Sequence, residues 1–76
     1  MFVTVKTLTG RKLTIDVNET MTFRDLKEEI SAKEGIEISQ IRMIYAGNMV
    51  NDVQKIQESN MKAGDILHLV LSLRGG

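Results

Sequence analysis

Apolar residues occupy every second position in the first part of the chain. The alternation runs over residues 1–6 and resumes over residues 12–17. A period of two is typical of strands that bury one face. Between the two runs lies TLTGR, in which Gly10 can adopt the backbone angles of a tight turn. The pattern therefore predicts an N-terminal β-hairpin whose inward residues are Met1, Val3, Val5, Leu13, Ile15 and Val17.

A helical period follows in MTFRDLKEEISAKEG. Thr22 is a suitable N-cap, with Asp25 three positions later to complete a capping box. Gly35 is a natural end, because glycine readily takes the left-handed conformation that closes helices. The face predicted to be buried consists of Phe23, Leu26 and Ile30.

The C-terminal half returns to a period of two. Residues 40–45 form a predicted strand with Ile41, Met43 and Tyr45 on its inner face, and AGN closes it as a turn. Residues 48–63 are less regular and are expected to hold a short strand, loops and one helical turn near residues 57–59. Residues 65–73, DILHLVLSL, give the strongest strand pattern of the chain. The order of elements predicts an α+β domain with one helix laid across a mixed sheet.

Composition restricts the possible functions. The chain has 76 residues, 42% of them hydrophobic, and ten basic residues balance ten acidic ones. This size supports one monomeric domain. The balanced charge argues against a nucleic-acid partner, and no run approaches the roughly 20 apolar residues that cross a membrane. Without a signal-peptide pattern, a cytoplasmic and nuclear protein is expected.

Motifs of catalysis and metal binding are missing from the sequence. There is no cysteine, and His68 is the single histidine, without a second ligand at metal-site spacing. None of the phosphate-binding, nucleophile-elbow or zinc-protease motifs occurs. We therefore expect neither an enzyme nor a metal site.

Two strands break the rule that the uncovered face of a sheet is polar. Ile44 lies opposite the inner residues of its strand. If Leu67, Leu69 and Leu71 face the core, then Ile66, His68, Val70 and Ser72 face outward. Leu8, at the hairpin tip, could join them. Spacing alone leaves two interpretations open: scattered exposed apolar residues, which are common, or a continuous protein-binding patch.

The chain ends in LHLVLSLRGG, a strand followed by a leucine, an arginine and two glycines. Such a terminus frays unless something binds it. It therefore either has no role or is bound by another molecule.

Several blocks together resemble ubiquitin and its closest relatives. They are VKTLTG, KEGI, the AG turn preceded by Arg42 and Ile44, LHLVL, and the final LRGG. The match runs without a gap from Met1 to Gly76. The resemblance implies the β-grasp fold for residues 1–72, a flexible conjugation tail at residues 73–76, and a protein modifier.

In that family an activating enzyme uses ATP to adenylate the terminal carboxylate and takes it as a thioester. A conjugating enzyme and a ligase then pass it to a substrate lysine as an isopeptide bond. The resemblance thus makes Gly76, together with Gly75, the conjugation site and a substrate, with no cofactor of its own. Enzymes that attach the tail and proteases that remove it would recognise Leu71, Ser72, Leu73 and Arg74.

The resemblance also gives the outward residues a role. It implies a partner-binding patch, recognised by domains of the ubiquitin-binding type, made of Leu8, Arg42, Ile44, Gly47, His68 and Val70. A second apolar patch would be made of Ile36, Leu71 and Leu73.

Departures from ubiquitin favour the cullin-attached Nedd/Rub type. Ser72 stands where ubiquitin has an arginine and the cullin modifier an alanine, and an unpaired charge there would cost a few kcal/mol in an activating enzyme. Asn48 and Ala63 replace the two lysines most used for ubiquitin chains. Tyr45 and Gly64 also match the cullin modifier, whereas Ala46 matches ubiquitin. The lysines left as possible acceptors are Lys6, Lys12, Lys27, Lys33, Lys55 and Lys62.

Three other interpretations remain open. A divergent or redesigned ubiquitin could serve as a modifier or a binding module, with Phe2, Thr4 and Lys62 as altered surface residues. A sulfur carrier shares the fold and the terminal Gly-Gly. The chain could also be a ubiquitin-like domain cut from a longer protein.

Overall fold

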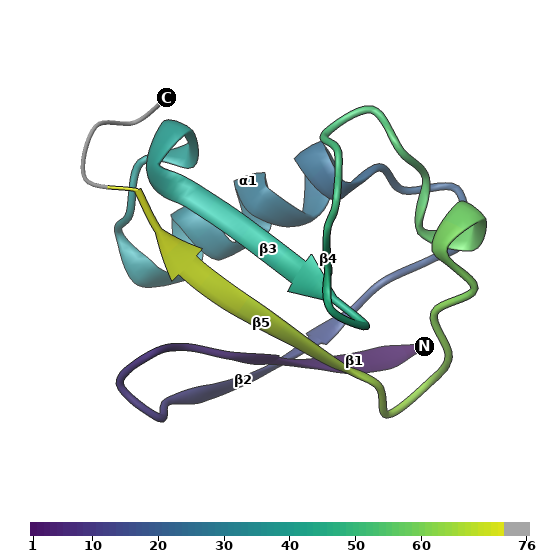
Figure 1. Ribbon diagram of the computed structural model, residues 1–76, viewed down its shortest axis with the longest axis horizontal. Helices are drawn as coiled ribbons and strands as arrows, with labels where there is room; N and C mark the ends of the chain where they lie inside the picture. The colour runs from purple at the N-terminus through teal and green to yellow at the C-terminus, as the bar shows by residue number, and fades with distance from the viewer. Residues whose placement is uncertain (73–76) are drawn as a thin grey trace.

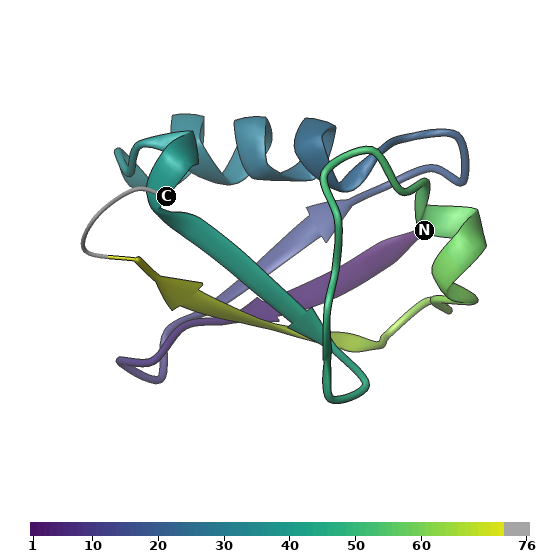
Figure 2. The ribbon, with the colours of Figure 1, turned by 45° about the horizontal axis from the view of Figure 1, so that its top comes forward.

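The computed structural model describes residues 1–72, and the tail residues Leu73, Arg74, Gly75 and Gly76 lie outside the described part. Within residues 1–72, one twisted sheet is covered on one face by the α-helix α1, and no α-helix of this part lies over the opposite face (Figures 1 and 2). The elements in chain order are β1 (Phe2–Lys6), β2 (Lys12–Asp16), α1 (Phe23–Glu34), η1 (Ile38–Gln40), β3 (Ile41–Tyr45), β4 (Asn48–Met49), η2 (Ile56–Ser59) and β5 (Ile66–Leu71).

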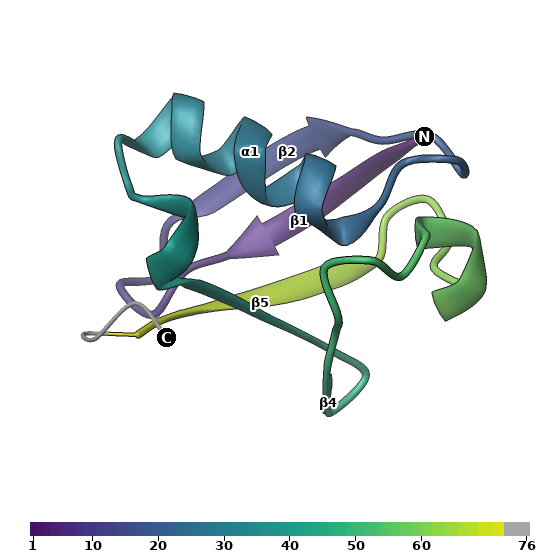
Figure 3. The same ribbon diagram turned by 90° about the horizontal axis from the view of Figure 1, so that it is seen from above.

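The sheet has five strands in the order β2-β1-β5-β3-β4. β1 and β5, from opposite ends of the chain, pair in parallel at its centre, and the other pairs are antiparallel. α1 crosses the inner face of this mixed sheet, as the view from above shows (Figure 3). The predicted α+β, β-grasp fold is confirmed.

Local signals set the bounds of α1. The Asp25 amide donates to Thr22 Oγ1 at 3.2 Å, and the Thr22 amide donates to Asp25 Oδ2 at 3.0 Å, so both halves of the predicted capping box form. Gly35 ends the helix in the left-handed region at φ 68°, and its amide donates to the Ser31 carbonyl. Phe23, Leu26 and Ile30 are buried as predicted.

The turn between β3 and β4 positions the outer end of the sheet. Tyr45 pairs with Asn48, and the two residues between them have positive φ, 52° at Ala46 and 82° at Gly47. This is the geometry of a two-residue hairpin whose twist suits antiparallel strands. A glycine adopts it easily, whereas the alanine accepts an uncommon conformation.

The core contains residues from the irregular segment as well as from the predicted elements. Val50, Ile56 and Met61 are buried beside the strand and helix residues. The helical turn expected near residues 57–59 is η2, which brings Ile56 inward. The sequence did not predict η1.

Leu71 lies on the same side of β5 as Leu67 and Leu69, opposite the buried Ile41, but it is not part of the core. Leu67 and Leu69 are buried, but Leu71 is 46% exposed. It lies at the end of β5 and lines an open pocket.

Candidate functional site

The outward side chains of β5 and β3 meet in register on the uncovered face of the sheet. Ile44 lies opposite His68, and Arg42 lies opposite Val70. Directly opposite residues have Cβ atoms about 4.5–5.5 Å apart, so these four side chains are neighbours. The strand order thus brings together four of the six residues predicted for the partner-binding patch.

The two remaining patch residues lie outside β3 and β5. Gly47 is exposed in the β3–β4 turn. Leu8 is 77% exposed in the β1–β2 loop. Arg42, Ile44 and Val70 are half-buried and His68 is exposed.

Two exposed apolar residues of this face, Met49 and Phe2, were not part of the predicted patch. Met49 of β4 lies opposite Ile44 and is 62% exposed. Its strand has only two residues, too few for a period to show. Phe2 is 60% exposed, and the alternation with Val3 was the signal that could have placed it outward.

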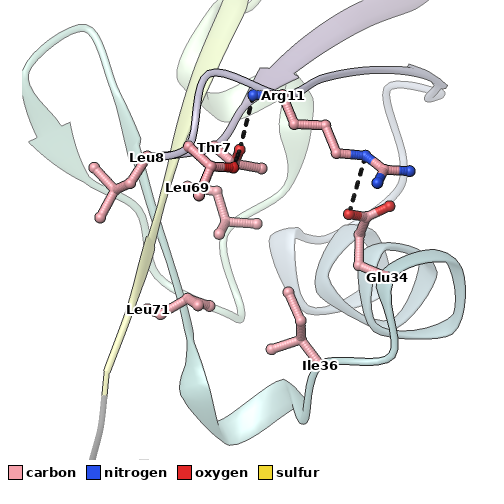
Figure 4. A pocket seen from close by; sticks show the side chains of 8 residues that line it. Thr7, Leu8, Arg11, Glu34, Ile36, Leu69 and Leu71 are labelled. Carbon is pink, nitrogen blue, oxygen red and sulfur yellow. Dashed lines mark hydrogen bonds and ion pairs between the residues drawn. The ribbon is translucent and has the colours of Figure 1, made fainter.

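A pocket of about 140 Å³ lies between the β1–β2 loop and the end of α1 (Figure 4). Leu8, Ile36 and Leu71 line it with Leu69 at its floor. The pocket brings together the described members of the second predicted patch, Ile36 and Leu71, with Leu8 of the first predicted patch. Leu73, the third member, lies outside the described residues.

Polar contacts hold the loop side of the pocket. The Arg11 amide donates to Thr7 Oγ1 at 3.1 Å, and the Thr7 hydroxyl also contacts that of Thr9 at 2.9 Å. Arg11 Nε lies 3.4 Å from Glu34 Oε1, so an ion pair joins the loop to the last turn of α1 (Figure 4). Leu8 is thus carried by a loop that is fixed at its base and exposed at its tip.

The residue before the predicted tail is hydrogen-bonded to the domain. The Ser72 amide donates to the Gln40 carbonyl at 2.7 Å, and Ser72 is half-buried. This bond joins the end of β5 to η1. Of the residues predicted for tail recognition, Leu71 and Ser72 therefore lie on the body of the domain.

The candidate acceptor lysines fall into two classes. Lys27 is only 6% exposed, and its ammonium donates to Asp52 Oδ1. The folded domain therefore does not present Lys27 to a conjugating enzyme. The other candidates are exposed: Lys6, Lys12, Lys33, Lys55 and Lys62.

A second polar contact ties β3 to the turn before β5. The Tyr45 hydroxyl and the Lys62 amide both donate to Asp65 Oδ2. The hydrogen bond from Tyr45, and then that from the Lys62 backbone, hold the pKa of the Asp65 carboxyl below its ordinary value. The same hydrogen bond to Asp65 raises the pKa of the Tyr45 hydroxyl, because it stabilises the protonated phenol.

Within residues 1–72, no three His, Asp or Glu side chains come together as metal ligands would. In the same part of the chain no helix has the length and apolar character needed to cross a membrane.

Comparison with known proteins places this geometry in a family. The profile of the ubiquitin family matches residues 3–74. The chain belongs to the ubiquitin family. It is 43% identical over its whole length to "Ubiquitin-like protein NEDD8" of Dictyostelium discoideum, covering 99% of that protein. The family membership confirms the prediction of a ubiquitin-like modifier in its general form.

Two other relatives also match over the whole length of this chain. The chain is 42% identical over all its residues to "Ubiquitin-like protein 1" of Schizosaccharomyces pombe, covering 97% of that protein. It is 41% identical, again over all its residues, to "NEDD8-like protein RUB1" of Saccharomyces cerevisiae, covering 99%. The predicted resemblance to Nedd/Rub-type proteins is confirmed at full length.

Proposed function

We propose that this ubiquitin-family chain is a protein modifier of the NEDD8/RUB type, conjugated through Gly76 to substrate lysines, with cullins as the expected substrates. It would act in the cytoplasm and nucleus and rely on activating, conjugating and ligase enzymes. The observation that carries the proposal is the end-to-end similarity, at 41–43% identity, to proteins named NEDD8 and NEDD8-like. The terminal LRGG supplies the group that would react.

The geometry at the end of β5 supports this role. Ser72 is fixed to Gln40, and four residues follow it in the sequence. Four extended residues span about 14 Å, long enough to enter an enzyme channel while the folded domain stays outside. Glycines at the last two positions leave no side chain to obstruct a narrow channel.

Ser72 is the position that we expect to select the activating enzyme. A serine hydroxyl carries no charge, so an enzyme that places carboxylates there to bind an arginine would leave them unpaired. Such a mismatch costs a few kcal/mol, which corresponds to a preference of about a hundredfold or more for the matching activating enzyme. The neutral Ser72 therefore favours an enzyme that does not require a cation at this point.

The test is thioester formation with two activating enzymes. The purified chain and ATP are mixed separately with the NEDD8-activating and ubiquitin-activating enzymes of Dictyostelium discoideum, the source of one relative. The products are measured by intact mass under non-reducing conditions. We expect the NEDD8-activating enzyme to charge the chain. The variant Ser72→Arg should be charged more readily than the wild type by the ubiquitin-activating enzyme.

A truncated chain lacking Gly75 and Gly76 is the matched control. It should not be charged, while its melting temperature should stay close to that of the full chain, because a terminal tail contributes little to the core. Charging by the ubiquitin-activating enzyme alone would identify a divergent ubiquitin. Charging by neither enzyme would refute the modifier proposal and favour a binding module or a sulfur carrier.

A further inference from the structure

A second pocket, of about 250 Å³, lies where α1, η1 and the start of β3 meet. It shares no lining residue with the pocket of about 140 Å³ described above, and neither Ile44 nor His68 lines it. We call it the cationic pocket. Its polar side chains come from four segments: Arg24 and Lys27 of α1, Ser39 of η1, Arg42 of β3, and Asp52 of the loop after β4.

Positive charge exceeds negative charge in the cationic pocket. Three of its side chains are cations, Arg24, Lys27 and Arg42, and Asp52 is its anion. Asp52 Oδ1 accepts from the Lys27 ammonium, and Asp52 Oδ2 lies 3.9 Å from Arg24. Arg42 forms no ion pair within residues 1–72. The pocket therefore has a surplus of two positive charges. Because like charges repel, this surplus does not stabilise the domain.

Most donors of the pocket are free to bind a ligand. Arg24 lies 3.5 Å from Glu28 and 3.9 Å from Asp52, and both contacts are longer than a hydrogen bond of about 2.7–3.2 Å. The Ser39 hydroxyl is exposed on η1 and donates to no group of residues 1–72. Arg42 is half-buried. Two guanidinium groups and a hydroxyl are thus open to an acceptor.

Lys27 forms the buried wall of the pocket. It is 6% exposed, and its bond to Asp52 holds the ammonium in place. An ammonium has three donors, and this bond uses one of them. Electrostatic attraction is stronger where water is partly excluded, so a fixed buried cation favours an anion that enters the pocket.

We propose that the cationic pocket binds a phosphate monoester carried by a phosphorylated serine or threonine of a partner protein. The inference goes beyond the proposed function and does not rest on it, because no lining residue of the pocket belongs to the tail at residues 73–76.

The chemistry of the pocket matches a phosphate monoester better than a carboxylate. A phosphate monoester carries a charge of about −1.5 to −2 at pH 7 and three strong acceptor oxygens. That charge is close to the surplus of the pocket, and the oxygens can accept from Arg24, Arg42 and Ser39. The planar arginine group binds phosphate through two parallel hydrogen bonds. A carboxylate has a single charge and two oxygens, which leaves one arginine without an anion.

The surroundings favour a protein side chain as the source of the phosphate. None of the described residues that line the pocket is aromatic, so nothing there stacks on the base of a nucleotide. A nucleic-acid backbone needs a stripe of basic residues, whereas this chain has ten basic and ten acidic residues in balance. The half-buried Ile38 beside Ser39 gives apolar surface for the residues that flank a phosphoserine.

The probe is a short peptide with blocked ends and a central phosphoserine flanked by leucines. The comparison ligands are the same peptide with serine, the same peptide with glutamate, inorganic phosphate alone, and a single-stranded oligonucleotide. Each is titrated into the full chain at pH 7, and amide chemical shifts give both the dissociation constant and the site.

We expect the phosphoserine peptide to shift the amides of Arg24, Ser39 and Arg42, and the serine peptide to shift none of them. The glutamate peptide should bind about tenfold more weakly or worse. Arg24→Gln should weaken the phosphoserine peptide about tenfold or more, because a hydrogen bond between charged groups is lost. Arg24→Lys should recover only part of this loss, because lysine keeps the charge but not the planar pair of donors.

Lys33→Gln is the matched control. It removes one positive charge from the same helix, but Lys33 does not line the pocket. It should leave the affinity for the phosphoserine peptide unchanged. Arg24 and Ser39 are exposed, so urea unfolding of Arg24→Gln and Ser39→Ala should differ little from that of the wild type, and Ser39→Ala should weaken the peptide severalfold.

Four results would overturn the inference: equal binding of the phosphoserine and serine peptides; equal losses of affinity in Lys33→Gln and Arg24→Gln; binding of inorganic phosphate as tightly as the peptide; or binding of the oligonucleotide but not of the peptide. The chain that lacks Gly75 and Gly76 should bind the phosphoserine peptide as tightly as the full chain. Phosphopeptide binding and thioester formation are therefore tested independently, and the failure of one leaves the other standing.

Discussion

The partly buried ion pair of Lys27 and Asp52 allows the sharpest prediction about stability. The Lys27 side chain is 8% exposed, whereas the Asp52 side chain is 40% exposed, so the cation depends on its partner and the anion keeps part of its hydration. Removing the anion should therefore cost more than removing the cation. The perturbations are Asp52→Asn and Lys27→Met.

The expected cost of Asp52→Asn follows from this asymmetry. Stranding one charge of a fully buried pair costs about 3–5 kcal/mol, and the partial exposure of Asp52 reduces this to about 1–3 kcal/mol. At the centre of that range the melting temperature falls by roughly 8–16 °C for a domain of this size. Lys27→Met retains most of the apolar stem and removes the buried charge, so its free energy of unfolding should change by less than about 1 kcal/mol.

Urea unfolding followed by circular dichroism measures both variants and the double variant. In the Lys27→Met background, Asp52→Asn should cost almost nothing, because no ammonium is left without a partner. Arg24→Gln is the control: Arg24 is exposed and its nitrogens lie 3.5 Å from Glu28 and 3.9 Å from Asp52, so its loss should cost under about 0.5 kcal/mol. A larger loss in Lys27→Met than in Asp52→Asn would refute the reasoning.

Three further predictions concern other parts of the domain. Because Asp65 has a lowered pKa in the folded state, its contribution to stability is present above its unfolded pKa and is lost as pH falls through the folded value. The free energy of unfolding between pH 5 and 2 should therefore fall more steeply for the wild type than for Tyr45→Phe. Parallel curves for the two proteins would exclude a role of the Tyr45–Asp65 hydrogen bond. Thr22→Ala should lower the unfolding free energy by about 1 kcal/mol through loss of the helix cap, and an unchanged thermal midpoint would contradict this. Met43→Ala should lower the free energy of unfolding by about 2–5 kcal/mol, because Met43 is fully buried. Ile44→Ala should lower it clearly less, because Ile44 faces outward. Equal losses in urea unfolding would show that the assignment of the two residues to opposite faces is wrong.

Elements whose signals are local could be predicted from the sequence. The capping box of Thr22 and Asp25 and the left-handed Gly35 fix α1 within its own residues. The alternation of β1, β2, β3 and β5 fixes their inner faces by the geometry of a strand. These features required no knowledge of distant contacts.

The burial of the segment from Val50 to Met61 could not be predicted, because distant contacts determine it. The Arg24 and Phe23 amides donate to the carbonyls of Asp52 and Gln54 at 3.0 Å, so this loop is bonded to the start of α1. Its apolar residues are buried by that attachment rather than by any period. The exposure of Leu71 has the same origin, since only the packing around the end of β5 decides it.

The candidate site lies between these two cases. Alternation placed Ile44, Val70 and Ile66 outward, but their adjacency depends on the strand order β1-β5-β3. The pairing of β1 with β5 joins the two ends of the chain, and no sequence spacing reveals it. Phe2 could be placed outward from the sequence, but its position beside Ile66 follows only from the register.

The outer face of β1 departs from sheet rules in two adjoining places. An aromatic side chain is exposed at Phe2, and Lys6 faces another lysine across to β2. Neither feature stabilises the folded domain: the first leaves apolar area in water and the second places like charges together. Each would be favourable if the face were covered, the aromatic by burial and the lysines by carboxylates.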